Sequence, residues 1–250
     1  MPLANWTLLN DGFTGTSIAV ASPPWSSNGV IYPANGIFNP ADVVHQDTGA
    51  PFDAAIDSSK CLVMASLGAG TLRGAHATRS STAVRGQITC SVRIRAAFDG
   101  PGQAGICVLQ NQQSMLPGLG GIAYALILDT IFFNNRLRLV QLTNGISGSP
   151  GGALGTSYIL LAETANAFFS SGVIQVLRLA WESDPVRLKG TRLRAWHGLS
   201  LASLVQLWDI VYTGTTAHVP TTSAGVGCIG EVVTNTFISY FDILTMEGAP

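Results

Sequence analysis

The chain has 250 residues, a formal net charge of −1, and 11% charged against 47% hydrophobic residues. An average soluble domain has roughly 25% charged residues. A surface this poor in charge favours burial against other subunits, and the net charge argues against general nucleic-acid binding, which needs an excess of Lys and Arg. The best candidate for a membrane span, Ile122 to Phe133, is interrupted by Asp129 and is shorter than the ~18 residues required. We therefore predict an oligomeric protein without a nucleic-acid partner or membrane insertion.

An irregular segment at about 21–52 precedes the first strong strand signal. Long structured loops are usually functional or contact a partner. Short alternating or β-branched runs between Gly, Pro and Ser clusters then predict strands. In the strand predicted at Gly86 to Phe98, the apolar residues Ile88, Cys90, Val92 and Ile94 alternate with polar residues, which predicts one buried and one wetter face. These first predicted strands are Lys60 to Ser66, Gly86 to Phe98 and Ala104 to Gln110.

The stretch AYALILDTIFFNNRLRLVQL, residues 123–142, predicts a β-hairpin. Asn134 and Asn135 are residue types that tolerate the positive φ of a tight turn, and the period of two resumes after them. Next, Ala and Glu cluster in Leu160 to Ser171, where we expect the chain's one helical turn.

The remaining strand signals are regularly punctuated by turn residues. The 28 Gly and 12 Pro residues are enough to separate ten or more strands. We find no internal repeat and no linker, so 1–250 is predicted to be a single all-β domain, an antiparallel two-sheet β-sandwich. The last predicted strands are Val173 to Trp181, Arg192 to His197, Leu204 to Tyr212, Gly225 to Val233 and Phe237 to Met246.

The cysteines and the N-terminus indicate the compartment of folding. The start, MPLANWTLLNDGF, lacks the basic and apolar regions of a signal peptide. The four cysteines, Cys61, Cys90, Cys107 and Cys228, are widely spaced without a CxxC pair, which disfavours a zinc knuckle or redox motif. Cys90 and Cys107 lie in apolar alternating runs, where a free Cys acts as a small core residue. We expect the chain to fold in a reducing cytoplasm.

The order of the motifs is more specific than any one of them. LLNDGFTG is followed by CLVMAS, ITCSVRIRAAF and AGICV, then by the hairpin, VLRLAWE and TRLRAWHG, and finally by SAGVGCIG and ISYFDILTMEG. This order resembles the concanavalin A-like lectin/glucanase jelly roll in its laminin-G-like variant. In that variant a strand with Gly-Val-Gly precedes a last strand carrying Phe-Asp, here Phe241-Asp242. The resemblance extends from about Trp6 to Glu247.

The resemblance implies carbohydrate binding or adhesion, and in bacteriophages such domains are frequent in tail and receptor-binding proteins. We therefore expect a non-enzymatic virion protein, a phage tail-associated subunit that folds and assembles in the host cytoplasm. Its expected partners are other copies of itself, other virion proteins and host-surface glycan. A purely architectural capsid or tail subunit that binds no sugar is an alternative.

A second alternative is a glycan hydrolase or lyase of the glucanase type that uses Glu182 and Asp184. Retaining glycosidases need carboxyl groups about 5–5.5 Å apart, and residues two apart on a strand share a face at roughly 6.6 Å. The expected further acid is missing from residues 185–188. Asp184-Pro185 also favours a turn, so we expect the strand to end before a second acid aligns. We predict no catalytic residues.

Sugar binding needs exposed aromatic faces with amide and carboxylate partners, for which the irregular segment and one strand offer candidates. The basic residues that follow Asp184 could bind phosphate, anionic glycan or an acidic neighbouring subunit, or form an ordinary polar face neutralised by Glu182 and Asp184. We interpret them as a subunit contact, and with one residue between them Arg192 and Arg194 share a strand face. The carbohydrate-binding candidates are Trp25, Tyr32, Asn35, Asp47 and Trp196, and the subunit-contact candidates are Arg187, Lys189, Arg192 and Arg194.

No metal site or other cofactor is predicted from the residues. The four histidines, His45, His76, His197 and His218, are dispersed without HxH or HxxxH spacing. Relatives of the resembled fold often bind calcium through oxygen ligands. Asp11 and Asp242 are the carboxylates that the resemblance offers for such an ion, and hydrogen-bonded loop anchors are the alternative role for both.

Overall fold

The computed structural model describes residues 43–47, 60–66, 73–80, 84–94, 102–110, 122–130, 135–143, 158–184, 188–214, 225–232 and 237–249. Side chains are described in residues 84–94, 103–109, 122–130, 135–143, 158–183, 188–214 and 247–248. Within these ranges, no helix has the length and apolar character to cross a membrane.

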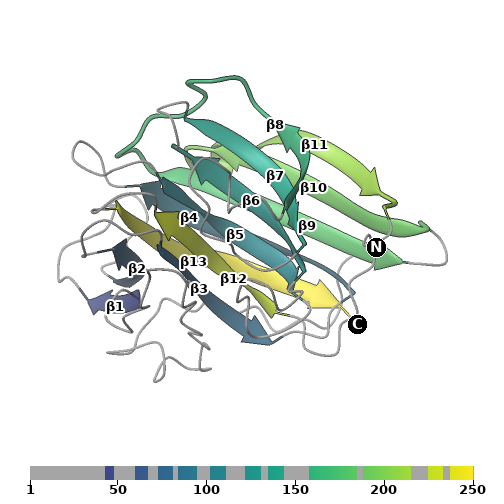
Figure 1. Ribbon diagram of the computed structural model, residues 1–250, viewed down its shortest axis with the longest axis horizontal. Coiled ribbons are helices and arrows are strands. Elements are labelled where there is room, and N and C mark those ends of the chain that lie inside the picture. Colours follow the sequence, from purple (N-terminus) through teal and green to yellow (C-terminus); the bar gives the residue numbers. More distant parts are fainter. Residues whose placement is uncertain are drawn as a thin grey trace.

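The described strands form two antiparallel sheets, seen in Figure 1 as two layers. The larger sheet has seven strands in the order β1-β2-β13-β4-β9-β10-β11. Its strands are β1 (Val43–Asp47), β2 (Lys60–Ser66), β4 (Arg85–Ile94), β9 (Gln175–Asp184), β10 (Gly190–Gly198), β11 (Val205–Tyr212) and β13 (Phe237–Ala249).

The smaller sheet has six strands in the order β3-β12-β5-β6-β7-β8. It includes two strands, β3 and β8, that the sequence did not predict. Its strands are β3 (Arg73–Ser80), β5 (Gly102–Gln110), β6 (Ala123–Asp129), β7 (Arg136–Leu142), β8 (Tyr158–Glu163) and β12 (Gly225–Val232). The predicted antiparallel two-sheet β-sandwich is thus confirmed, and β1 lies inside the segment for which irregular structure was expected.

The predicted helical turn in Leu160 to Ser171 is wrong. Strand β8 occupies its first part and pairs with β7, with Ile159 opposite Gln141 and Glu163 opposite Arg138. The backbone amide of Thr164 continues this pairing by donating to the carbonyl of Leu137 at 3.0 Å. Pairing with a sheet edge satisfies backbone groups and here outweighs the helix preference of Ala and Glu.

The predicted hairpin exists, but its connection is longer than a two-residue turn. β6 ends at Asp129 and β7 begins at Arg136. Asn135 has the positive φ that was expected of it, 44°. Its carbonyl accepts a hydrogen bond from the amide of Phe168 at 2.9 Å, and its side-chain amide donates to the carbonyl of Phe169 at 3.1 Å. Asn135 therefore ties the hairpin to the segment that follows β8.

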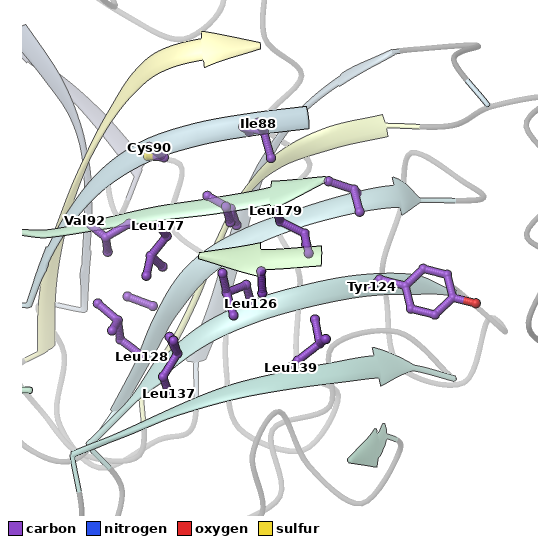
Figure 2. Close-up of a cluster of buried hydrophobic side chains, with 14 of the residues drawn as sticks. Ile88, Cys90, Val92, Tyr124, Leu126, Leu128, Leu137, Leu139, Leu177 and Leu179 are labelled. Atoms are coloured by element: carbon purple, nitrogen blue, oxygen red, sulfur yellow. The ribbon is translucent and has the colours of Figure 1, made fainter. Parts of the chain in front are cut away.

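The core lies between the two sheets and is built from alternate residues of the central strands. In Figure 2, Leu126, Leu128, Leu137 and Leu139 of the smaller sheet lie across from Leu177 and Leu179 of β9. The predicted inward residues of β4 are all in this cluster, so the buried face read from the sequence is confirmed. The predicted wetter face is wrong at Thr89 and Ser91, which are also fully buried. The larger sheet contributes to this cluster the side chains of Ile88, Cys90, Val92, Ile94, Leu177, Leu179, Trp181, Leu193 and Ala195.

The outward side of the smaller sheet carries a second buried cluster. Cys107, Ala125, Ile127 and Val140 belong to it, while the apolar residues next to them in the chain belong to the main core. Strand β6 is therefore buried on both faces, which explains its nearly continuous apolar run. Asp129, which interrupts that run, is itself buried and forms an ion pair with Arg138 at 2.7 Å.

The prediction for the cysteines is confirmed where the structure tests it. Cys90 and Cys107 are both buried. They lie in different clusters, on opposite sides of the smaller sheet. Cys61 and Cys228 are on strands whose side chains are not described.

A polar contact joins the two sheets at one end of the core. Tyr124 of β6 is fully buried and accepts a hydrogen bond from the side chain of Gln141 at 3.2 Å. It is also hydrogen-bonded to Thr191 of β10 and meets the ring of Tyr212 edge-on at a centroid distance of 6.4 Å. Burial raises the pKa of Tyr124 to about 12, so its hydroxyl stays protonated.

We predict that Tyr124→Phe lowers the free energy of unfolding by about 1–3 kcal/mol, because Gln141 and Thr191 then lose a partner inside the core. Urea denaturation of both proteins measures the difference. Tyr158→Phe is the control, since Tyr158 packs at the margin of the second cluster. Equal stability of Tyr124→Phe and Tyr158→Phe would contradict the proposed role of the contact.

Candidate functional site: the outer face of the larger sheet

The side chains of β9 and β10 alternate between the core and the outer face of the larger sheet. Leu177, Leu179 and Trp181 enter the core, so the intervening Arg178 and Glu182 project outward. In β10, Leu193 and Ala195 enter the core, and the intervening residues are outward by the same rule. The outward residues of β10 are Arg192, Arg194 and Trp196.

The register of the strands sets these side chains in rows. Arg192 lies opposite Glu182 on β9 and Val211 on β11. Arg194 lies opposite Ala180 on one side and Asp209 on the other.

The third row is centred on a tryptophan. Trp196 lies opposite Arg178 of β9 and Gln206 of β11, next to a register shift between Ala195 and Trp196. Directly opposite residues of an antiparallel pair have Cα atoms about 4.5–5.5 Å apart. Trp196, which is partly exposed, therefore has an arginine beside it on the neighbouring strand.

Arg192 is engaged by an acid within the chain. Its Nε and Nη2 donate to the two carboxylate oxygens of Asp209 at 2.7 and 2.6 Å. This two-point hydrogen bond lowers the pKa of Asp209 and raises the pKa of Arg192. Since both groups are exposed, the pair contributes little to stability and is weakened by salt.

Arg194 and Arg178 have different surroundings from Arg192. The guanidinium of Arg194 lies over the ring of Trp196, 5.9 Å from its centroid, a cation–π contact. The Nε of Arg178 donates to the hydroxyl of Thr89 at 2.9 Å. Within the described ranges, neither arginine forms an ion pair with a carboxylate.

The two acids considered for catalysis both lie in β9. The expected end of the strand before Asp184 is wrong, because β9 continues to Asp184, which pairs with Gly190 of β10. A proline restricts the residue before it to extended conformations, so Pro185 permits Asp184 to end the strand. Glu182 stands between Arg85 of β4 and Arg192 of β10 in the register, so its neighbours in this row are cations.

The other sequence candidates are placed only in part. Trp25, Tyr32, Asn35, Asp11 and Arg187 lie outside the described residues. Asp47 ends β1 and Asp242 lies in β13 opposite Ser91, with no description of either side chain. Lys189 is exposed in the turn before β10, with φ 53°. The expectation that Arg192 and Arg194 share a face is confirmed by the strand's burial alternation.

Two residues of this face were missed as site candidates. Asp209 is on another strand, and nothing in the local sequence indicates that it binds Arg192. Arg178 was not considered as a site residue, and its place opposite Trp196 follows from the β9–β10 register.

His197 lies on the core side of β10, where neighbouring residues hold its ring in place. Its Nε2 is 2.7 Å from the side-chain oxygen of Gln175, and its ring lies 4.8 Å from that of Phe168, centroid to centroid. Burial lowers the pKa of His197 below its usual value. Among the described residues, no group of three or more His, Cys, Asp or Glu is arranged to hold a metal ion.

No family model matches the sequence, and no curated protein matches it. Solved structures with the same fold do match. The exoplasmic/lumenal domain of VIP36, in its Ca2+/Man3GlcNAc-bound form, has a TM-score of 0.52 and 11% identity, with 98% of this chain and 93% of that chain covered. The carbohydrate recognition domain of Emp46p, in its potassium-bound form, has a TM-score of 0.52 and 12% identity, covering 98% and 100%.

A polysaccharide-cleaving enzyme shares the fold as well. A mutant of alginate lyase Aly36B, in complex with alginate trisaccharide, has a TM-score of 0.52 and 11% identity, with 97% of this chain and 98% of that chain covered. These likenesses, over nearly whole chains, show that this protein has the concanavalin A-like jelly-roll fold that its motif order resembles. At such low identity they establish the fold and leave function to the site.

We predict that acid destabilises the protein partly through His197. With a folded-state pKa below the unfolded value of about 6.5, the unfolded chain binds the extra proton first. The contribution to stability is therefore complete above pH 6.5 and declines as the pH falls below it. Urea denaturation between pH 5 and pH 7.5 should give a shallower pH dependence for His197→Gln than for the wild type. Parallel curves would show that His197 does not contribute.

Proposed function

We propose that the chain is a non-enzymatic, lectin-like module that binds glycan on the outer face of its larger sheet. The observation that carries this proposal is the partly exposed ring of Trp196, flanked by hydrogen-bonding side chains on neighbouring strands. Aromatic rings offer an apolar face to the C–H groups of a sugar, and adjacent polar groups fix its orientation. Gln206, Arg178 and Arg194 surround Trp196 in this arrangement.

The matching structures support glycan recognition as an analogy at the level of the fold. VIP36 was captured with Man3GlcNAc, and the matching part of Emp46p is a carbohydrate recognition domain. The alginate lyase keeps the enzymatic alternative open, which would use Glu182 and Asp184 here. We prefer binding because the residues directly opposite Glu182 on both neighbouring strands are cations, Arg85 and Arg192, and not a second carboxyl group. The acid two residues along the strand, Asp184, is the last residue of β9.

We predict that Trp196→Ala weakens glycan binding by roughly tenfold or more, as expected when a central aromatic contact is removed. The measurement is isothermal titration with the strongest binder from an array of bacterial-surface, plant and algal glycans. Lys189→Ala is the control, because Lys189 is exposed in a turn of the same strand pair. Unchanged affinity in Trp196→Ala would place the glycan elsewhere, and cleavage of the bound glycan would favour the lyase or hydrolase.

We also propose that the module works as a subunit of an assembly of its own copies, in a virion and specifically in a bacteriophage tail. Two observations support the assembly. The charge-poor composition leaves little to keep a lone chain soluble. The edge strands β8 and β11 lie next to each other in Figure 1, and large exposed apolar side chains gather on them and on nearby turns. These are Ile159, Leu160, Val173, Leu199, Leu201, Val205 and Val211.

Strand β11 offers little protection against pairing with another chain. Natural edge strands are commonly shielded by Lys, Pro or short length. The eight residues of β11, VQLWDIVY, include neither Lys nor Pro, and the one acid, Asp209, is bound by Arg192. This edge therefore suits β-sheet extension by a neighbouring subunit. The sequence also predicts a subunit contact at Arg187, Lys189, Arg192 and Arg194, and this stays a prediction.

We predict that the purified wild-type chain sediments as an oligomer and that Val211→Lys shifts it to smaller species, because a charge on the edge opposes pairing. Ser170→Lys, at an exposed turn position, is the control and should leave the oligomer unchanged. Density fractionation of host lysate should place the wild-type chain with particles. A monomeric wild-type chain that remains in the soluble fraction would contradict the assembly proposal.

A further inference from the structure

The charges around Trp196 do not cancel locally. Asp209 stands opposite Arg194 in the register, yet both of its oxygens accept hydrogen bonds from Arg192. The guanidinium of Arg194 instead lies over the ring of Trp196. Asp209 interacts with Arg194 only through a longer-range electrostatic attraction.

Arg178 lies opposite Trp196 in the register, on the neighbouring strand β9. Arg194, by contrast, is two residues away from Trp196 along β10, roughly 6.6 Å for an extended strand. Thr89 takes only the Nε of Arg178. The Nη groups of Arg178 have no protein partner within the described residues. Trp196 thus has one guanidinium over its ring, that of Arg194, and a second arginine opposite it on β9. Among the described residues, neither arginine forms an ion pair with a carboxylate.

We infer that this site takes an anionic sugar, whose ring stacks on Trp196 while its acidic group is held by Arg178 and Arg194. This inference rests on the glycan binding proposed above and specifies the class of glycan. A guanidinium presents parallel N–H donors that match the oxygens of a carboxylate or a sulfate. A neutral sugar would leave both cations without a counter-charge, so the arrangement discriminates in favour of an acidic one.

The net charge of the chain does not oppose this inference. At −1 overall, the protein has no general attraction for polyanions, so selectivity for acidic glycan depends on the local pair. The carboxylate of a uronic acid fits the pair best, because it is attached directly to the sugar ring that would stack on Trp196. Sulfated sugar is the other source of the same chemistry.

The test compares three oligosaccharide probes of similar length by isothermal titration at low and high salt. These are an oligouronate, a sulfated dextran oligomer and a neutral glucan oligomer. We expect the oligouronate to bind at least tenfold more tightly than the neutral oligomer at low salt, and this preference to shrink at high salt. Stronger binding of the sulfated probe would assign the site to sulfated sugar within the same anionic class.

Variants connect the preference to the two arginines. Arg178→Gln and Arg194→Gln should each weaken oligouronate binding by roughly tenfold, the loss of one charge-assisted hydrogen-bond pair, with the affinity for neutral glucan unchanged. Arg194→Lys should restore only part of the preference, because it keeps the charge without the planar donors. Lys189→Gln removes an exposed charge from the same strand pair and should change nothing. Circular dichroism confirms that each variant is folded.

The outcomes separate this inference from the proposed function. If neutral and acidic probes bind wild type equally, and the arginine variants leave both unchanged, the anionic class is wrong although the chain still binds glycan through Trp196. If no probe and no arrayed glycan binds, both proposals fail. If single-stranded DNA binds as tightly as the oligouronate and loses affinity in the same variants, the site recognises polyanions in general and the sugar assignment is wrong.

Discussion

The register between β9 and its two neighbours, β4 and β10, fixes both the core and the outer face of the larger sheet. Because successive side chains of a strand point to opposite sides, a slip by one residue exchanges the faces. The pairing that buries Leu177, Leu179 and Trp181 also requires Arg178 and Glu182 to project outward. The burial of large apolar side chains, each about 1.5–3 kcal/mol, therefore holds the charged residues of the site in position.

The same constraint explains how Trp196 and its neighbours come together. Trp196 and Arg194 are close because they share a face of one strand, and Arg178 joins them through the register of another. Asp209 lies opposite Arg194 across β10 and β11, but its carboxylate accepts its hydrogen bonds from Arg192. Rigid strands thus fix the placement of these groups more firmly than loops would.

Much of this could be predicted from local patterns. The alternation in ITCSVRI gave the correct inward residues of β4, and the spacing of Arg192 and Arg194 gave their common face. The wetter face predicted for β4 is buried at Thr89 and Ser91, and two further local predictions were wrong. At β8, pairing with β7 outweighed the helix preference of Ala and Glu, and at Asp184 the strand continued to the residue before proline. Contacts between strands distant in sequence, such as Arg178 with Thr89, are set by register, which a single sequence does not encode locally.

The account is tested most directly by a crystal structure of the chain with a bound oligouronate. It predicts a sugar ring stacked on Trp196, with its carboxylate hydrogen-bonded to Arg178, Arg194 or both. An oligouronate bound at another part of the chain, with Trp196 and the two arginines uncontacted, would contradict the assignment of the site to this sheet face.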